Sequence, residues 1–333
     1  MIDIYFGTAA DREYAERPLT LIDVGARGGL QPNWRRARRH LRLVGFEPDA
    51  SEHARLAAGA DARTLYINAA VAREQGKATF NVARDPGTSS LLAPNMAFLR
   101  RFPRAERFET RQRIAVAADR LDSLLPAHGV SDPDFLKLDT QGAELAILQG
   151  AQDTVARLLL GIELEIQLAP LYIDQPSFGA LDDFLRAAGF QLFDLRPSYW
   201  KRAAGALYGG PKGQLVFCDA LYLRTEESFG ALVGRYADAD ARRSKLLRML
   251  SVALLYGYVD FAIEIFQGHR SELDTALVAA IDGQLRSDIP FSARVPHFRG
   301  RGWLSHLFYR LHRALTPTVE RWASGGRHLG NMD

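Results

Sequence analysis

The sequence predicts an α/β fold in which a mostly parallel sheet is flanked by helices. An apolar run over residues 19–24 leads into a glycine-rich turn and then into a helix-forming segment that follows Pro32. Two further apolar runs, residues 42–46 and 135–138, each end at a carboxylate. Strands, turns and helices that alternate in this order are typical of nucleotide-binding α/β domains.

The glycine-rich turn narrows the choice of cofactor. Its glycines permit a sharp turn and let a ligand approach the backbone without meeting a Cβ. Arg27 stands where a dinucleotide fingerprint needs its second glycine, and no phosphate-binding Gly-x-x-x-x-Gly-Lys-Ser/Thr motif occurs. The remaining pattern, Asp-Val-Gly-Ala-x-x-Gly, fits S-adenosylmethionine, although an ordinary strand-to-helix turn explains the glycines alone equally well. From this turn we predict cofactor contacts by Asp23, Gly25, Ala26, Arg27 and Gly28.

Composition describes a globular chain. Its 333 residues are 47% hydrophobic and 24% charged, enough for one large or two modest domains. The net charge of +3 does not demand a nucleic-acid partner, and we predict none. The single cysteine, Cys218, excludes an internal disulfide and suits a buried strand. No signal-peptide pattern and no apolar run of roughly 18 residues occurs, so we expect a cytoplasmic protein.

Acidic and small polar residues end the next two predicted strands. Glu47 follows residues 42–46, where a carboxylate accepts hydrogen bonds from the ribose hydroxyls of an adenosine. The alternative is that Glu47 is a charge near the N-terminus of the following helix, where the helix dipole favours it. Residues 65–71 predict a third strand, which places Asn68 and Ala69 near the adenine. Residues 77–83 predict a strand with no assignable partner, and the loop 87–91 either approaches the reacting centre or only connects elements.

Two arginine-rich segments raise the question of an anionic ligand. Both are more often solvated faces than binding sites for phosphate, lipid or nucleic acid, and we expect the solvated case. They comprise Arg35, Arg36, Arg38 and Arg39, and then Arg100, Arg101, Arg104, Arg107, Arg111 and Arg113.

The most informative stretch is residues 134–151. A short strand ends at Asp139, Gly142 makes the exit turn, and a helix begins at Glu144 and ends near Gly150. At a strand end that faces the cofactor crevice, Asp139 contacts the methionyl ammonium, orients the acceptor or takes its proton. The alternative is a turn-capping aspartate bonded to the amide of Gln141 or Gly142.

Together these segments resemble the FkbM family of S-adenosylmethionine-dependent methyltransferases. The resemblance rests on Asp-Val-Gly-Ala-Arg-Gly-Gly, Gly-Phe-Glu-Pro-Asp and Phe-Leu-Lys-Leu-Asp-Thr-Gln-Gly-Ala-Glu, and it covers roughly residues 19–225. It implies a Rossmann-like class I methyltransferase fold with seven strands, and O-methylation of a sugar, glycan or secondary metabolite. A scaffold that binds the cofactor without catalysis, or assembles on a membrane surface, is the alternative from another class.

The resemblance also assigns residues. The matching positions are Asp23, Gly25 and Gly28 in the cofactor loop, Glu47 as the ribose acid, the block Lys137, Asp139, Gly142 and Glu144, then Glu165 and Asp219 on later strands. Gln141 and Arg27 depart from the common Glu and Asn of the family. We predict that Asp139 and Glu165 are the catalytic carboxylates, that Arg27 contacts the cofactor carboxylate or an anionic acceptor, and that no metal is bound.

Residues 226–333 lie outside the resemblance and predict a helical extension to a methyltransferase domain of residues 1–225. Helices are expected over residues 226–255 and 258–285. Trp303 to Leu315 has the pattern of a basic amphipathic helix. We expect its aromatic face to pack in the core; the alternatives are a partner, another copy in an oligomer, or a membrane surface contacted peripherally. The remaining expected partner is a hydroxylated small molecule or glycan.

Overall fold

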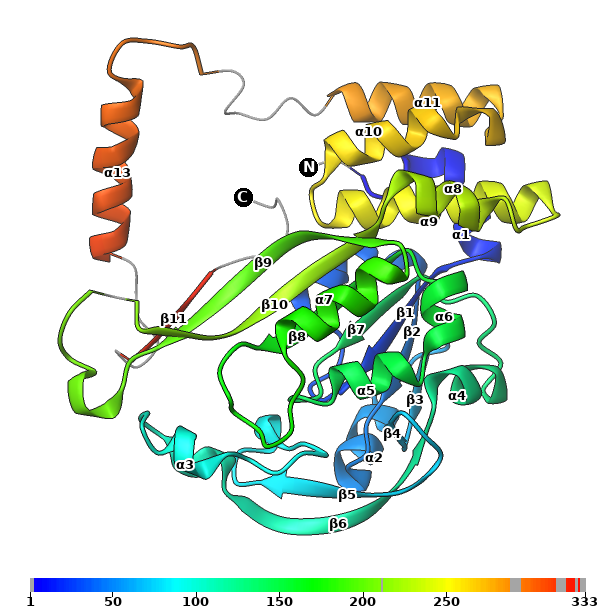
Figure 1. Cartoon of the computed structure of the whole chain (residues 1–333). Helices are drawn as coiled ribbons and strands as arrows, with labels where there is room; N and C mark the ends of the chain where they lie inside the picture. Colours follow the sequence, from blue (N-terminus) through cyan, green and yellow to red (C-terminus); the bar gives the residue numbers. More distant parts are fainter. Residues whose placement is uncertain (1–2, 211, 288–294, 316–321, 327–328, 330–333) are drawn as a thin grey trace.

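The computed structural model describes residues 3–210, 212–287, 295–315, 322–326 and 329. Its main sheet has eight strands in the order β11-β9-β10-β8-β7-β1-β2-β3 (Figure 1). In chain order these strands are β1 (Leu19–Val24), β2 (Leu41–Phe46), β3 (Thr64–Ile67), β7 (Phe135–Leu138), β8 (Gly161–Gln167), β9 (Phe190–Trp200), β10 (Gln214–Arg224) and β11 (Ala323–Gly325). The five strands from β3 to β8 are parallel, and β10 runs antiparallel to its neighbours β8 and β9. The predicted α/β class is confirmed, and the short β11 adds an eighth strand at the edge.

A second, three-stranded sheet lies beside the ends of β1 and β2. It has the order β4-β6-β5, with β4 (Ala70–Val71), β5 (Gly76–Ala83) and β6 (Thr110–Asp119). The strand predicted over residues 65–71 is therefore wrong as one element: β3 ends at Ile67, and the chain crosses through Asn68 and Ala69 into the second sheet. The predicted strand 77–83 is present and pairs with β6.

Helices cover both faces of the main sheet, because alternate residues of its strands point to opposite faces. Leu21 of β1 packs with the N-terminal and C-terminal helices, whereas Ile22 packs with the central helices. The first group comprises the 3-10 helices η1 (Gly7–Ala10) and η2 (Pro32–His40) and helices α1 (Asp11–Glu16), α8 (Glu226–Val233), α9 (Ala239–Leu255), α10 (Val259–Gly268) and α11 (Thr275–Ser287). The second comprises α4 (Leu121–Ala127), α5 (Glu144–Gln149), α6 (Gln152–Arg157) and α7 (Phe178–Ala187).

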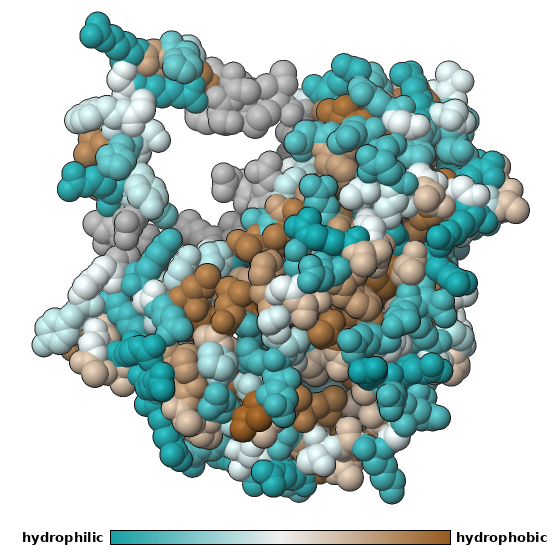
Figure 2. Space-filling model, viewed as in Figure 1, coloured by the Kyte–Doolittle hydropathy of each residue, from teal (hydrophilic) through white to brown (hydrophobic). Residues whose placement is uncertain are grey.

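The remaining elements contribute no residue to these two hydrophobic clusters. They are α2 (Ala50–Ala58), α3 (Met96–Leu99), η3 (Pro86–Thr88), η4 (Ala105–Phe108), η5 (Ala203–Gly205), η6 (Arg270–Glu272) and α13 (Arg301–Leu315). Hydrophobic residues also gather in a band over β9, β10 and α7 on the face shown in Figure 2. Leu195 of β9 and Leu215 of β10 are among the exposed large apolar residues of the molecule.

The C-terminal helices differ from the expected pair. Residues 226–255 form two helices because Asp238 caps the start of α9, where its side chain accepts from the amides of Asp240 and Ala241. Residues 258–285 likewise divide into α10 and α11. These helices pack against β1, β7 and β10 within one hydrophobic core. The division of the chain at residue 225 stays a prediction.

The expected helix near the C-terminus is present as α13, but its aromatic face does not pack in the core. Trp303 is 71% exposed and Phe308 is 63% exposed. Arg294, Arg321 and Arg327 of the basic tail lie outside the described residues. Among the helices that the structure describes, none has the length and apolar character needed to cross a membrane.

The arginine-rich segment 100–113 is mostly solvated, as expected. Arg100, Arg101 and Arg104 are exposed. Arg107 is the exception, because its guanidinium lies 4.8 Å from the ring centroid of Phe108 and 4.9 Å from that of Trp200. Cys218 is buried in β10, which confirms the prediction for the single cysteine.

Candidate active site

A pocket opens at the carboxyl ends of β1, β2 and β7, the edge at which open α/β sheets bind ligands. Its empty volume is about 770 Å³, including space open to solvent at its mouth. It is lined by Val24, Gly25, Arg27, Phe46, Glu47, Pro48, Ala69, Ala70, Val71, Phe80, Pro86, Gly87, Ser89, Leu91, Asp139, Thr140, Gln141 and Ile147. Of the predicted site residues, Gly25, Arg27, Glu47, Ala69 and Asp139 therefore meet here. Asp23, Ala26, Gly28, Asn68 and Glu165 do not line the pocket, and their contacts with cofactor or acceptor stay predictions.

Gly25 is required by the protein backbone itself. A Cβ at this position would stand 2.1 Å from the carbonyl oxygen of Asp139, and the residue has a φ of +83°. The amides of Gly25 and Ala26 both donate to the carbonyl oxygen of Phe46 at 3.1 Å. The glycine therefore lets the end of β7 close onto the turn after β1, whereas the sequence had suggested close approach of a ligand.

Glu47 presents a carboxylate at the end of β2. Its side chain is 2% exposed, and its Oε1 accepts from the amide of Asp49 at 2.9 Å. Burial raises the pKa of Glu47 above its ordinary value. The cap of α2 is Asp49, whose Oδ1 accepts from the amides of Ser51 and Glu52. Asp49 therefore caps α2 as the sequence allowed, and Glu47 lines the pocket. The alternative role of Glu47, a charge favoured by the dipole of α2, stays open.

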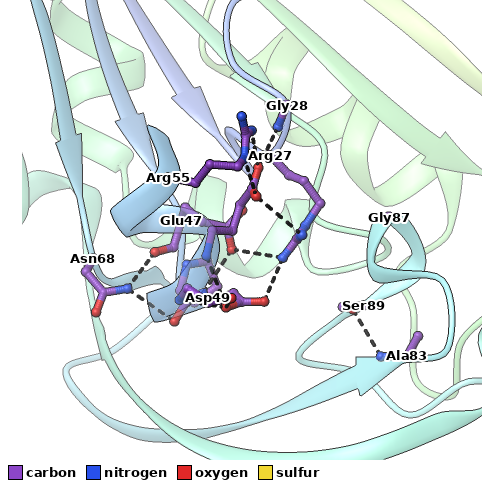
Figure 3. A network of polar contacts seen from close by, with 12 residues as sticks. Arg27, Gly28, Glu47, Asp49, Arg55, Asn68, Ala83, Gly87 and Ser89 are labelled. Atoms are coloured by element: carbon purple, nitrogen blue, oxygen red, sulfur yellow. Dashed lines mark hydrogen bonds and ion pairs between the residues drawn. The ribbon is translucent and has the colours of Figure 1, made fainter. Parts of the chain in front are cut away.

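Asn68 and Arg27 fix the surroundings of Glu47 (Figure 3). The Nδ2 of Asn68 donates to the carbonyl oxygen of Glu47 at 2.8 Å. The guanidinium of Arg27 lies 2.9 Å from Asp49 and 3.8 Å from Glu47. These contacts hold Arg27 at the end of β2, with the loop that carries Gly87 across the pocket from it. Its predicted contact with the cofactor carboxylate or an anionic acceptor stays a prediction.

Gln141 joins the two predicted catalytic carboxylates. Its Nε2 donates to Asp139 Oδ1 at 3.0 Å and to Glu165 Oε1 at 2.8 Å. Its Oε1 accepts from the hydroxyl of Tyr172 at 2.8 Å. Gln141 has a φ of +58°, a left-handed conformation that is uncommon outside glycine and concentrates at functional sites. In the sequence Gln141 is notable only as a departure from the common Glu of the family, and nothing local predicts its contact with Tyr172.

Burial and charge together keep Glu165 from ionising easily. Burial raises the pKa of Glu165 well above its ordinary value, and the neighbouring carboxylates of Asp139 and Asp219 raise it further. Gln167 donates a second hydrogen bond to Oε1 at 2.8 Å. A carboxyl group with a raised pKa can exchange a proton nearer to neutral pH.

Glu144, and not Asp139, caps the turn between β7 and α5. Its Oε1 accepts from the amide and hydroxyl of Thr140, both at 3.0 Å, and from the amide of Gly142 at 3.2 Å. The side chain is fully buried, and this burial raises its pKa to about 7. Asp139 bonds the side chain of Gln141 and not a turn amide, so the turn-capping alternative for Asp139 is wrong.

A loop from the second sheet completes the pocket. Phe80 of β5 and Pro86, Gly87 and Ser89 of the segment around η3 line it. The hydroxyl of the adjacent Ser90 donates to the carbonyl oxygen of Gln141 at 2.8 Å. The loop 87–91 therefore reaches the candidate site and does more than connect elements.

Comparison with known proteins decides the family. The family model described as Methyltransferase FkbM domain matches residues 23–192, just over half of the chain. The chain belongs to the FkbM methyltransferase family. A comparison with curated proteins gives no match.

The chain is also similar to solved methyltransferases, at low sequence identity. One is a methyltransferase FkbM from Methylobacillus flagellatus KT, with 14% identity and a TM-score of 0.36; the match covers 62% of this chain and 43% of that one. Another is a TehB-like SAM-dependent methyltransferase from Corynebacterium glutamicum, with 9% identity, a TM-score of 0.30, and coverage of 65% and 88%. A third, the 1,6-didemethyltoxoflavin-N1-methyltransferase of Burkholderia thailandensis with bound S-adenosylhomocysteine, has 14% identity, a TM-score of 0.26, and coverage of 67% and 79%.

The pocket suits S-adenosylmethionine, the cofactor of this family. The carboxylate of Glu47 lies at the position that holds ribose hydroxyls in this fold. Ala69 and Ala70 offer a small apolar wall, and Asp139 stands at the end of the neighbouring strand.

The first acid of the FkbM loop is turned away from this pocket. Asp23 is 2% exposed, and its Oδ1 lies 3.1 Å from the Nζ of Lys137 on β7. Burial opposes the charge on Lys137, but the carboxylates of Asp23 and Asp139 outweigh it and raise the pKa of the lysine. Asp23 thus ties β1 to β7. Within the part of the chain that the structure describes, no group of three or more His, Cys, Asp or Glu side chains could hold a metal ion.

Proposed function

We propose that this FkbM methyltransferase transfers a methyl group to a hydroxyl of a sugar, glycan or secondary metabolite. The observation that carries the proposal is the pair of carboxylates, Asp139 and Glu165, that Gln141 joins at the edge of the cofactor pocket. A hydroxyl is a weak nucleophile, and a nearby carboxylate increases its reactivity by removing its proton.

In this mechanism S-adenosylmethionine supplies an electrophilic methyl group on a sulfonium. Asp139, which lines the pocket, orients the acceptor hydroxyl and takes its proton on a carboxylate oxygen as the new carbon–oxygen bond forms and the carbon–sulfur bond breaks. Glu165 lies behind Gln141 and acts through it, because the Gln141 amide bonds both Glu165 and Asp139 and so positions Asp139 beside the acceptor. Phe80, Pro86 and Ser89 exclude water from the reacting groups.

Glu47 and Arg27 have binding roles in this proposal. Glu47 accepts hydrogen bonds from the ribose of the cofactor, and its position is held by the amide of Asp49 and by Asn68. Arg27 balances the negative charge of Glu47 and Asp49, from which it lies 3.8 and 2.9 Å. A charge-assisted hydrogen bond contributes about 1.5–3 kcal/mol to binding.

The test measures S-adenosylhomocysteine formed by the purified protein with panels of hydroxylated glycans, hydroxylated metabolites and matched amines. We expect turnover with a hydroxyl acceptor, and Asp139→Asn is expected to lower kcat about 10²- to 10⁴-fold with the cofactor affinity retained. Asp153→Asn, on the exposed surface of α6, is the matched control.

Two results would contradict this proposal. Preference for the amines would reject O-methylation. Tight cofactor binding without turnover on any acceptor would favour the alternative in which the domain is a non-catalytic scaffold.

A further inference from the structure

Helix α13 is amphipathic and has no partner for its apolar side among the described contacts. Its sequence, RGWLSHLFYRLHRAL, contains no acidic residue. Apart from Tyr309, the apolar residues of the helix whose side chains the structure describes are Trp303, Leu304, Leu307, Phe308, Leu311 and Leu315. With 3.6 residues per turn, these six project within an arc of about 140°. Five of them are exposed large hydrophobic residues, Leu315 being 75% exposed.

Two of the three arginines of α13 lie at the borders of this arc. On the same projection, Arg301 and Arg310 lie about 20° beyond its two edges. Ser305, His306, Tyr309 and His312 occupy the opposite side. Arginines that flank an apolar stripe can bury their aliphatic stems beside it and keep the guanidinium in a polar layer. This arrangement is typical of helices that lie in the plane of a membrane surface.

The position of α13 agrees with such a role. Figures 1 and 2 show the helix standing clear of α8, α9, α10 and α11. Its exposed apolar residues are therefore available to an external surface. The sequence from residue 290 to the C-terminus adds further arginines, seven in total against two acidic residues, Glu320 and Asp333.

Three binding partners could cover the apolar side of α13: a second copy of the helix, a nucleic acid or a lipid surface. The positive charge of the helix distinguishes between them. A second copy of α13 would bring the border arginines of both helices together with no carboxylate in either helix to pair with them. A nucleic acid would engage the arginines but leave Trp303 and Phe308 in water. An anionic lipid surface satisfies both, because acyl chains accept the apolar residues and headgroups attract the arginines.

We propose that α13 docks this protein on an anionic lipid surface, with Trp303, Leu307, Phe308 and Leu311 inserted at the headgroup boundary. This contact is independent of the proposed methyl transfer. It places the domain beside a surface whose own lipids or glycolipids carry hydroxyl groups.

The test is co-sedimentation of the full chain with vesicles of phosphatidylcholine alone and of phosphatidylcholine with phosphatidylglycerol. We expect binding to the anionic vesicles, weakened by added salt, and little binding to phosphatidylcholine alone. Phe308→Glu and the double variant Arg301→Glu with Arg310→Glu are each expected to lower the partition coefficient at least about tenfold. Ser305→Ala, an exposed change on the polar side of the same helix, is the control and keeps wild-type binding.

Three outcomes would overturn the proposal. They are absence of binding to anionic vesicles, equal binding by Phe308→Glu and the wild type, and dimerisation through α13 without vesicle binding. The affinity for S-adenosylhomocysteine is measured on every variant to show that the methyltransferase domain is folded. A loss of vesicle binding with this affinity retained is then independent of the test of catalysis.

Discussion

At the scale of single residues, the sequence predicted which polar residues end the strands. It did not predict the long-range contacts that the neighbouring residues make. Glu47 and Asp139 follow apolar runs in the sequence, and both line the pocket. Gln141 is different, because its role depends on Tyr172 and Glu165, which lie 31 and 24 positions away in the chain. The reason for Gly25 also escaped sequence reasoning, since the crowding atom belongs to Asp139.

Gly25 and Gly28 form a matched pair for a first prediction. Both have a φ of +83°, but a Cβ at Gly28 would have no atom within 4 Å. Gly28→Ala should therefore lower the free energy of unfolding by only about 1–2 kcal/mol, the cost of a left-handed alanine. Gly25→Ala should lower it by about 3 kcal/mol or more, because β1 and β7 must also separate. Urea unfolding measures both, and equal losses would show that the Asp139 carbonyl does not constrain this turn.

Glu144 gives a prediction about pH. Its pKa is raised by burial from an ordinary value of 4.5 to about 7 in the folded protein. The folded state therefore holds a proton that the unfolded state has lost, so the stability from this group is present below pH 4.5 and is lost as pH rises through 7. Between pH 5 and 8, the free energy of unfolding should fall by about 2 kcal/mol more in the wild type than in Glu144→Gln.

Chemical denaturation at several pH values gives this difference. The other buried carboxyl groups contribute equally to the pH dependence of both proteins, so the difference between the two profiles reports Glu144 alone. Parallel pH profiles for the two proteins would mean that Glu144 ionises normally in the fold.

At the scale of elements, the parallel strands were predicted well and the C-terminal helices less well. Residues 19–24 and 135–138 form mostly apolar strands buried on both faces, which makes their sequence pattern strong. The break between α8 and α9 depends on the N-terminal cap of α9 by Asp238. Such a cap contributes little to the free energy of folding and involves a single side chain, so its sequence signal is weak. The apolar face of α13 is as regular as that of a core helix, so periodicity alone could not tell that it is exposed.

A buried ion cluster fixes α9 to the loop before β7. Asp134 is fully buried, and it lies 2.8 Å from Lys245 and 3.0 Å from Arg248. Asp132 pairs with the same two cations, at 2.8 and 2.6 Å. Asp134→Asn removes the fully buried one of these two carboxylates, so we expect a loss of about 3 kcal/mol in the free energy of unfolding.

Arg286→Ala is the comparison for this cluster, because it removes an exposed pair with Asp282 on α11 and should cost under about 1 kcal/mol. Guanidinium chloride is unsuitable because it screens charges, so urea is the denaturant. Similar losses in the free energy of unfolding for Asp134→Asn and Arg286→Ala would show that α9 is held by its apolar contacts and not by the ion cluster.

At the scale of the whole molecule, the sheet and the helices α8 to α11 share one core. Leu21 of β1, Leu221 of β10 and Leu250 of α9 belong to the same buried cluster. We therefore expect residues 3–287 to unfold in one cooperative transition, with equal midpoints by far-ultraviolet circular dichroism and tryptophan fluorescence. Two separated transitions would show that the C-terminal helices unfold independently of the sheet.

The fold class was predictable because local and long-range signals agreed along residues 19–225. The antiparallel pair of β5 and β6 could not be placed, since the sequence of residues 77–83 does not indicate its partner strand. Its loop supplies Pro86, Gly87 and Ser89, which makes one wall of the pocket a product of tertiary structure. The acceptor is set by such walls, and this is why the sequence predicts the cofactor more closely than the substrate.

The central claim is that the pocket between β1, β2 and β7 binds S-adenosylmethionine through Glu47. Titration calorimetry with S-adenosylhomocysteine tests it on the wild type, on Glu47→Gln, and on the control Glu74→Gln, whose side chain is 83% exposed. We predict one site per chain, a loss of about 10- to 100-fold in affinity for Glu47→Gln, and no change for Glu74→Gln. Undiminished affinity in a folded Glu47→Gln protein would contradict the account.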